Sequence, residues 1–460
     1  MTETQTNQIS DFQKSKDYYY TKNYDKSLLY IIKYLKLYPN NFEALLFKGK
    51  IYYTLKQYLK SIQTYEKCIK QDNKCIEAIY NQGKCLKELN LYNEAIDKFK
   101  NAIEIEPSSK IYNSIGACLY NMGNKEEAIC QYNKAIKLDN YYTPSYFNKG
   151  ICLSNLDRKE EAILEYNKAI ELNNNYVDAY FQRGYCFYSL GKYKEAIIEM
   201  NKVIELDINY PQAYFERGSC YIKLNRFDEA IIEISKAIEL NPNFFNAYFQ
   251  RGYCYNKMKK FNEAIIDFKK TIELNSNLQE PYFRLGLCYM ELNKNLNAIE
   301  MFDKVIQLNR TFVDAYYNKG LCLSKLGRFE EAIYYFNCIL SYDRKNLIDS
   351  SDISVYYNKA TCLMKLERFT EAINMFNNVI EMKNNFMEAY CKRGMCFYLS
   401  EKYDEAIQDF NIYISYMENK KKNCIDYYVI RANCYLKLKK NDEAMKNLDE
   451  FCLNTINNYI

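Results

Sequence analysis

Residues 211–244 read PQAYFERGSCYIKLNRFDEAIIEISKAIELNPNF, and this stretch decides the fold. When Pro211 is taken as position 1, its apolar or small residues stand at positions 4, 8, 11, 17, 20, 21, 24, 27 and 28. Spacings of three and four residues are typical of amphipathic helices. The stretch therefore predicts two helices joined by a short polar turn.

The same pattern recurs along the whole chain. Ten of the 13 glycines occupy position 8 of a 34-residue period, and the other three follow position 8 by seven residues, in the predicted turn. All six prolines fall at the joins between units, where a missing N–H does no harm. A fixed period of this length predicts stacked helix pairs. The 13 units start at residues 8, 42, 76, 109, 143, 177, 211, 245, 279, 313, 353, 387 and 425.

These starts predict the organisation of the chain. Residues 1–7 are expected to form a short disordered N-terminus, residues 8–343 repeats 1–10, and residues 353–458 repeats 11–13. The segment 344–352 is predicted to be an insertion in a repeat join, and 416–424 carries a second, shorter insertion. Both insertions are interpreted as longer loops or local bends.

The glycine at position 8 needs a structural reason, because glycine inside a helix costs about 1 kcal/mol relative to alanine. Position 20 is alanine in eleven repeats, for example Ala162 and Ala230. We therefore expect the two helices of each repeat to approach closely, with position 20 facing position 8.

These slots resemble the signature of the tetratricopeptide repeat (TPR) family. In the fifth repeat the signature positions hold Tyr146, Gly150, Leu153, Ala162, Tyr166 and Ala169, while Asn174 departs from the family's proline. The resemblance implies an all-α fold, a right-handed α-solenoid superhelix of about 13 helix-turn-helix repeats. It also implies that the first helices line a concave groove.

The composition argues against catalysis. Histidine is absent, which removes the usual general base and the commonest zinc ligand. Eleven of the 18 cysteines occupy position 10 of successive repeats, too far apart for disulfides, and are expected to be reduced, buried packing residues. No glycine is left for a phosphate-binding loop. We expect no enzyme, no cofactor and no metal site.

Charge and hydropathy narrow the partners and the location. The net charge is only +5, with Lys and Glu dispersed through the repeats, so no nucleic-acid partner is expected. The sequence contains no run of 18 apolar residues, so no membrane span is expected, and the N-terminus has no apolar signal region. The predicted location is the cytoplasm. A cytoskeletal or ciliary assembly would suit so long an array, and a nuclear location stays open.

Two positions predict ion pairs inside the repeats. Position 7 is mostly cationic, and wherever position 23 is acidic, position 7 of the same repeat carries a cation. The predicted pairs are Lys149–Glu165, Arg183–Glu199, Arg217–Glu233, Arg251–Asp267 and Arg393–Asp409.

The resemblance places positions 2, 5, 6, 9, 12 and 13 in the groove. Position 5 is aromatic through the middle of the chain, and position 6 carries amides that could hold a peptide backbone. Repeats six to eight are richest in groove aromatics. The candidate partner-binding residues are Phe181, Gln182, Tyr185, Tyr188, Phe215, Glu216, Phe249, Gln250 and Tyr253. The alternative is that position 5 simply packs between adjacent first helices.

The predicted function is a non-catalytic scaffold that mediates protein–protein interaction and complex assembly through its groove and its termini, binding an extended peptide or a helix. The alternative is a co-chaperone-like or targeting receptor for an extended peptide. The lysine that the family's chaperone-binding clamp needs at position 5 is never present, which disfavours an acidic C-terminal ligand. The last helix is predicted to contact a partner or a second copy of the chain through its apolar residues: Met445, Leu448, Phe451, Cys452, Leu453 and Ile456.

Overall fold

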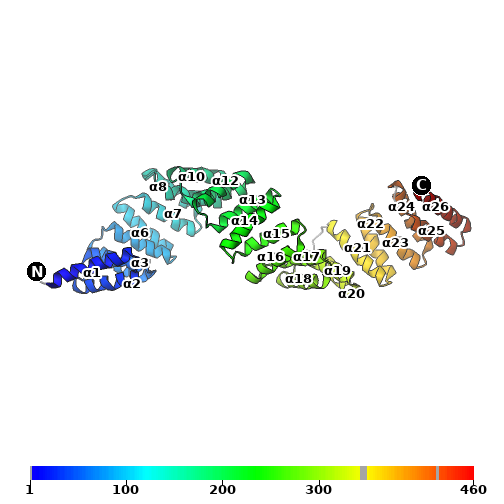
Figure 1. Cartoon of the computed structure of the whole chain (residues 1–460), viewed down its shortest axis with the longest axis horizontal. Helices are drawn as coiled ribbons and strands as arrows, with labels where there is room; N and C mark the ends of the chain where they lie inside the picture. The colour runs from blue at the N-terminus through cyan, green and yellow to red at the C-terminus, as the bar shows by residue number, and fades with distance from the viewer. Residues whose placement is uncertain (1–2, 342–349, 421–423, 460) are drawn as a thin grey trace. The chain divides into compact units, whose positions relative to one another are not determined.

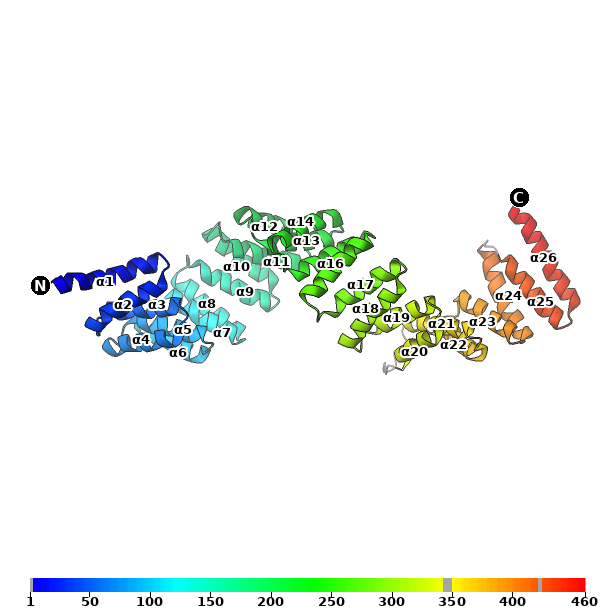
Figure 2. The same cartoon turned by 60° about the horizontal axis from the view of Figure 1, so that its bottom comes forward.

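A computed structural model describes residues 3–341, 350–420 and 424–459, with side chains described for 11–341, 352–420, 424 and 426–450. The described chain consists of helices that follow one another in pairs (Figures 1 and 2). It divides into two compact units, residues 1–241 and 242–460, which we call the N-terminal unit and the C-terminal unit. The predicted all-α solenoid of helix-turn-helix repeats is confirmed.

Each repeat contributes a first and a second helix. The first helices are α1 (Glu3–Tyr20), α3 (Phe42–Thr54), α5 (Ile76–Glu88), α7 (Ser109–Asn121), α9 (Thr143–Asn155), α11 (Val177–Ser189), α13 (Pro211–Lys223), α15 (Phe245–Lys257), α17 (Gln279–Glu291), α19 (Val313–Lys325), α21 (Ser350–Lys365), α23 (Met387–Leu399) and α25 (Ile425–Lys437). The second helices are α2 (Tyr24–Leu37), α4 (Tyr58–Gln71), α6 (Tyr92–Ile105), α8 (Lys125–Leu138), α10 (Lys159–Leu172), α12 (Tyr193–Leu206), α14 (Phe227–Leu240), α16 (Phe261–Leu274), α18 (Asn295–Leu308), α20 (Phe329–Leu340), α22 (Phe369–Met382), α24 (Tyr403–Asn419) and α26 (Asn441–Tyr459).

The helix ends differ from the predicted boundaries in three places. Helix α1 begins at Glu3, before residue 8, where the first repeat was predicted to start. The insertion at 344–352 lies mostly outside the described residues, and α21 begins within it, at Ser350. Helix α24 continues into the insertion at 416–424 as far as Asn419, and residues 421–423 lie outside the described residues.

The turn between the two helices has the same backbone conformation in every repeat. Position 15 has a positive φ in all of them, but glycine fills it only at Gly123, Gly191 and Gly327. The other ten repeats place a non-glycine residue there, with φ between 55° and 62°. This left-handed conformation costs an L-residue roughly 1–2 kcal/mol. The ten residues are Lys22, Lys56, Asn90, Asp157, Asn225, Lys259, Asn293, Glu367, Glu401 and Lys439.

Position 8 is glycine because the ring or chain at position 24 fills the space of a Cβ. A Cβ on Gly150 would lie 2.5 Å from Cε1 of Tyr166, and the position-24 residue blocks each of the other nine helical glycines in the same way. Position 20 also faces position 8, as predicted, since a Cβ on Gly218 would lie 3.3 Å from the carbonyl oxygen of Ala230. The predicted alanine contact is thus correct but secondary to position 24.

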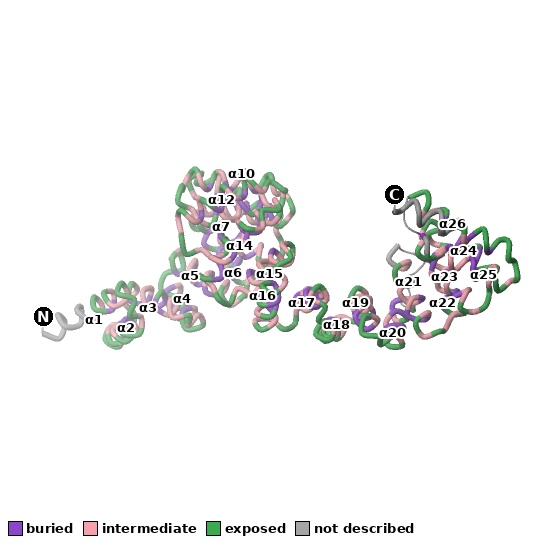
Figure 3. The backbone as a smooth tube through the Cα atoms, turned by 45° about the vertical axis from the view of Figure 1, so that its right-hand side comes forward, coloured by how far each residue is buried: buried purple, intermediate pink, exposed green. Residues whose placement is uncertain are grey.

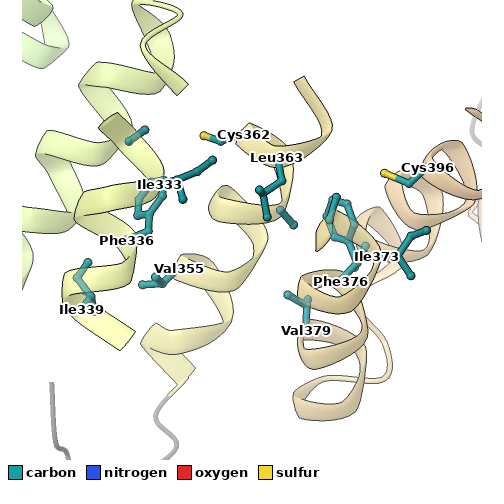
Figure 4. Close-up of a cluster of buried hydrophobic side chains, with 14 of the residues drawn as sticks. Ile333, Phe336, Ile339, Val355, Cys362, Leu363, Ile373, Phe376, Val379 and Cys396 are labelled. Carbon is teal, nitrogen blue, oxygen red and sulfur yellow. The ribbon is translucent and has the colours of Figure 1, made fainter. Parts of the chain in front are cut away.

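Buried residues recur along the helices of the described chain (Figure 3). Figure 4 shows this core in the C-terminal unit, where Phe336 of α20 and Phe376 of α22 are fully buried on either side of α21. The eleven position-10 cysteines are all 0% exposed, and every described cysteine is free. Their predicted packing role is confirmed. Burial raises the pKa of these thiols, for example to about 11 for Cys118.

All five predicted ion pairs are present. The Arg183–Glu199, Arg251–Asp267 and Arg393–Asp409 pairs have closest N–O distances of 2.7 Å, and Lys149–Glu165 has 2.8 Å. The fifth pair joins Arg217 to Glu233. Several of the arginines also reach an asparagine of the preceding repeat, which sequence reasoning missed. These second bonds join Arg183 to Asn167, Arg217 to Asn201 and Arg393 to Asn377.

Candidate functional site

The nine predicted binding residues belong to two compact units. Phe181, Gln182, Tyr185 and Tyr188 lie on α11, and Phe215 and Glu216 on α13, all in the N-terminal unit. Phe249, Gln250 and Tyr253 lie on α15 in the C-terminal unit. All nine are at least partly accessible to solvent, and Tyr185 is the most open, with 43% of its surface exposed.

The aromatic residues at position 5 serve largely as packing residues. The ring of Phe181 lies 5.4 Å from that of Tyr210 and packs against the buried Met200 and Val203. In the C-terminal unit the ring of Phe249 lies 5.8 Å from that of Phe268. Ring pairs at these separations are ordinary core contacts. The observations favour the alternative interpretation of position 5, in which its ring packs within the solenoid.

Glu216 stands out among the predicted residues. Burial raises its pKa from 4.5 to about 7, and among the described residues it has no hydrogen bond or ion pair that would offset this. Its charge in turn contributes to the raised pKa of Tyr188, which burial and Glu216 together bring to about 12. Its neighbours at the same position of adjacent repeats are the neutral amides Gln182 and Gln250.

Several position-6 amides are already hydrogen-bonded within the protein. Asn148 Nδ2 donates to Asn113 Oδ1 at 3.0 Å, and Asn358 Nδ2 donates to the hydroxyl of Tyr317 at 3.0 Å. Asn318 Nδ2 donates to the carbonyl of Asp314 at 2.8 Å. These bonds use amide donors that were predicted to hold the backbone of a ligand. Asn81 differs, since it makes no hydrogen bond in the described structure.

A cavity that sequence reasoning missed contains Asn81. It has a volume of about 700 Å³ and lies among the first helices α1, α3, α5 and α7 of the N-terminal unit. This volume falls in the range typical of ligand sites, about 300–1,000 Å³. We call it the N-terminal cavity. Its lining includes Tyr19, Lys50, Tyr53, Glu77, Tyr80, Asn81, Lys84, Glu106 and Lys110.

The lysines of the N-terminal cavity lie over tyrosine rings of the preceding repeat. Lys50 Nζ lies 5.0 Å from the ring centre of Tyr19, and Lys84 Nζ lies 4.4 Å from that of Tyr53. Lys110 continues the series at 4.8 Å from the ring of Tyr80. Cation–π contacts of this kind hold an ammonium group in place without neutralising its charge.

The cavity lining carries three lysines and two glutamates, which leaves an excess of positive charge. None of its three lysines has an ion pair or a hydrogen bond with a described residue. Burial, followed by repulsion from Lys110 and Lys87, lowers the pKa of Lys84. Glu77 and Glu106 also line the cavity but are exposed and contact none of the lysines closely enough to form an ion pair.

A sequence signal for this cavity did exist. Lys50 and Lys84 both occupy position 9, and Tyr19 and Tyr53 both occupy position 12, so the two residues recur together one period apart. The signal was missed because it joins neighbouring repeats, whereas the predicted site was chosen by the density of aromatic residues within single repeats.

The outer surface carries an aliphatic stripe that was also missed. Position 22 of three successive second helices in the N-terminal unit holds Leu164, Ile198 and Ile232, which are 66%, 64% and 68% exposed. In the C-terminal unit Ile266 occupies the same position and is 67% exposed. We call the first three residues the outer stripe.

The predicted self-association surface is described only in part. Met445 is 59% exposed and Leu448 is half-buried, while the side chains of Phe451, Cys452, Leu453 and Ile456 lie outside the described residues. Among the described residues, no three Cys, Asp or Glu side chains gather as a metal site would require. None of the helices formed by the described residues is both long enough and apolar enough to cross a bilayer.

Comparison with known proteins identifies the repeat. Sequence profiles described as tetratricopeptide repeat match residues 42–75, 76–109, 109–142, 177–210, 211–244, 245–278, 279–312, 313–346 and 353–386. A profile described as TPR repeat matches residues 158–191. Together these matches cover more than half of the chain. The search of curated proteins found no match.

Several solved structures are similar to parts of the chain. YrrB, a TPR protein with an unusual peptide-binding site, is 26% identical over 41% of this chain and 97% of its own, with a TM-score of 0.37. MamA is 26% identical over 36% of this chain and 92% of its own, with a TM-score of 0.35. The C-terminal part of a TPR protein from Cytophaga hutchinsonii is 22% identical over 52% of this chain and 98% of its own, with a TM-score of 0.45. Scores of this size carry no conclusion about a partner.

Proposed function

Because this chain belongs to the tetratricopeptide repeat family, we propose that it is a non-catalytic scaffold that binds segments of partner proteins on its first helices. The observation that carries the proposal is the N-terminal cavity. It lies on the layer that the first helices form, where α3 contacts α5 and α5 contacts α7. An open cavity on several successive helices suits an extended chain better than a small molecule.

The chemistry of the site supports binding rather than catalysis. The chain has no histidine, and its position-10 thiols are buried with raised pKa values, which keeps them protonated and unreactive at neutral pH. Glu216 is an isolated carboxyl group without a described partner to form a catalytic pair. A scaffold needs none of these groups to react.

A comparison of two surface variants tests the proposal. Tagged wild-type protein, a Tyr53→Ala/Asn81→Ala variant of the cavity and an Ile198→Asp/Ile232→Asp variant of the outer stripe are used to capture partners from the native cells. We expect the cavity variant to lose a defined set of partners that the outer-stripe variant retains. Loss of partners only from the outer-stripe variant would contradict binding on the first helices.

The predicted site in repeats six to eight is tested separately. Tyr185→Ala in the N-terminal unit and Tyr253→Ala in the C-terminal unit remove the aromatic rings with the least packing role there. Loss of partners from these variants would favour the predicted site over the N-terminal cavity. A peptide receptor, the alternative function, would have one dominant partner, whereas a scaffold would have several. The same capture experiment gives the number of partners. A cytoplasmic location stays part of the proposal.

A further inference from the structure

We infer that the N-terminal cavity selects an extended protein segment rich in Asp and Glu side chains, with Lys50, Lys84 and Lys110 as its cationic contacts. The inference deepens the proposed function and rests on it, because it names the partner chemistry of the same surface. It differs from the chaperone-binding arrangement, which places its lysines at positions 5 and 2 and which this chain does not contain.

The first argument is that none of the three lysines has a carboxylate partner in the described part of the chain, whereas some lysines elsewhere in it do. Lys168, Lys202 and Lys236 on the second helices each bind the glutamate three residues later, at 2.8 or 2.9 Å. The cavity lysines have no such partner, and each is held on a tyrosine ring instead. An anionic ligand would supply the missing charge.

The second argument is the placement of the lysines. Lys50 lies on α3, Lys84 on α5 and Lys110 on α7, so each helix presents one ammonium group. Neighbouring helices pack about 10 Å apart, and an extended chain advances about 3.3 Å per residue. The three lysines span two such gaps, about 20 Å, which about seven extended residues cross, or about nine with one flanking residue at each end. A segment of this length with several single carboxylates therefore fits the row better than one dianionic group.

The third argument separates a protein from a nucleic acid. Glu77 and Glu106 line the same cavity, are exposed to solvent and would repel a continuous phosphate backbone. A peptide can place its carboxylates on the lysines and neutral residues beside the two glutamates. One face of each tyrosine is already covered by a lysine, which leaves fewer faces for base stacking.

The experiment measures peptide binding to the full chain by fluorescence anisotropy. The probes are labelled peptides of about nine residues with the same apolar residues and with Glu, Gln, Lys or phosphoserine at alternating positions, and a single-stranded oligonucleotide. We expect the Glu peptide to bind more than about tenfold tighter than the Gln peptide, with an affinity that falls as salt is added.

Charge reversal identifies the surface. Lys84→Glu is expected to weaken binding of the Glu peptide by more than about tenfold, and Lys84→Gln by about fivefold. Lys134→Glu is the matched control, because it changes the net charge equally and Lys134 also lies over a tyrosine, Tyr112, but outside the cavity. It should leave the affinity unchanged. Circular dichroism of each variant checks that it is folded.

Each outcome separates the two proposals. One outcome is that the Glu and Gln peptides bind the wild-type protein equally and that the Tyr53→Ala/Asn81→Ala variant loses both. This result would keep the scaffold function and overturn the acidic specificity. Equal losses in Lys84→Glu and Lys134→Glu would also overturn it, since the effect would then be one of net charge. Tighter binding of the phosphoserine peptide or of the oligonucleotide would overturn the choice of carboxylates. No binding of any probe, together with unchanged partner capture by the cavity variant, would overturn both proposals.

Discussion

Arg393 holds Asp409 in a two-pronged ion pair that ties the two helices of one repeat together. Arg393 Nε and Nη2 donate to Asp409 Oδ2 and Oδ1 at 2.8 and 2.7 Å. Arg393 Nη1 donates to Asn377 Oδ1 of the preceding repeat at 2.6 Å. Asp409 is 2% exposed, so the pair sets the register both within a repeat and between repeats.

We predict that removing one partner of this pair lowers the free energy of unfolding far more than replacing both partners with apolar residues. Asp409→Ala leaves a buried guanidinium without its partner and should lower the free energy of unfolding of the C-terminal unit by about 3–5 kcal/mol. Arg393→Met combined with Asp409→Leu should recover most of this loss, because neither charge is then buried. Urea denaturation, with hydrogen exchange of α23 and α24 as a local probe, measures both variants.

The control is an exposed pair of the same chemistry. Arg226 binds Glu229 at 2.8 Å on the surface, and Glu229→Ala should cost less than about 1 kcal/mol. If Asp409→Ala were as mild as Glu229→Ala, the buried pair would have no role in holding the register.

The left-handed turn residues offer a route to a more stable protein. Lys259 has a φ of 60°, a conformation that glycine adopts without the penalty of a Cβ. Lys259→Gly should therefore raise the free energy of unfolding by up to about 1 kcal/mol, and Gly191→Ala should lower it by a similar amount. Thermal denaturation followed by circular dichroism checks both. A destabilised Lys259→Gly would mean that the lysine side chain contributes more than its backbone strain costs.

Glu216 predicts a pH dependence of stability. Its pKa is about 7 in the folded protein because burial disfavours the charged form, whereas an unfolded chain has the ordinary value near 4.5. Between these two values the folded protein binds a proton that the unfolded chain has released. The free energy of unfolding should therefore fall as the pH rises from about 4.5 to about 7, and this contribution should stay constant above.

Glu216→Gln tests this dependence directly. The variant should match the wild-type protein near pH 4.5 and be more stable at pH 8, because the neutral amide carries no buried charge. Glu229→Gln is the control, since a hydrogen bond from Arg226 lowers the pKa of Glu229 instead. The same pH profile in wild-type protein and Glu216→Gln would show that Glu216 is solvated in solution.

Much of the fold could be predicted from the sequence because the same packing residues recur at the same positions of each repeat. Position 24 fills the space beside Gly150 as it does beside Gly286, so a single register fixed every helix pair. The ion pairs were predictable for the same reason. A cation at position 7, such as Arg183, accompanies every acidic residue at position 23, such as Glu199.

The site was harder to predict because it depends on contacts between repeats. Phe181 was predicted to contact a ligand, but its ring packs on Tyr210, the N-cap residue of α13, which is the first helix of the next repeat. The Lys84–Tyr53 contact joins position 9 of one repeat to position 12 of the one before it. No spacing within a single repeat indicates that these two residues meet.

Photo-crosslinking tests the central claim most directly. A photoreactive amino acid is placed at Asn81 in the N-terminal cavity and, in a second protein, at Ile198 on the outer stripe. Both proteins are irradiated in the native cells, and the crosslinked peptides are identified by mass spectrometry. The Asn81 probe should capture partner segments rich in Asp and Glu. Crosslinks formed from Ile198 and none from Asn81 would contradict it.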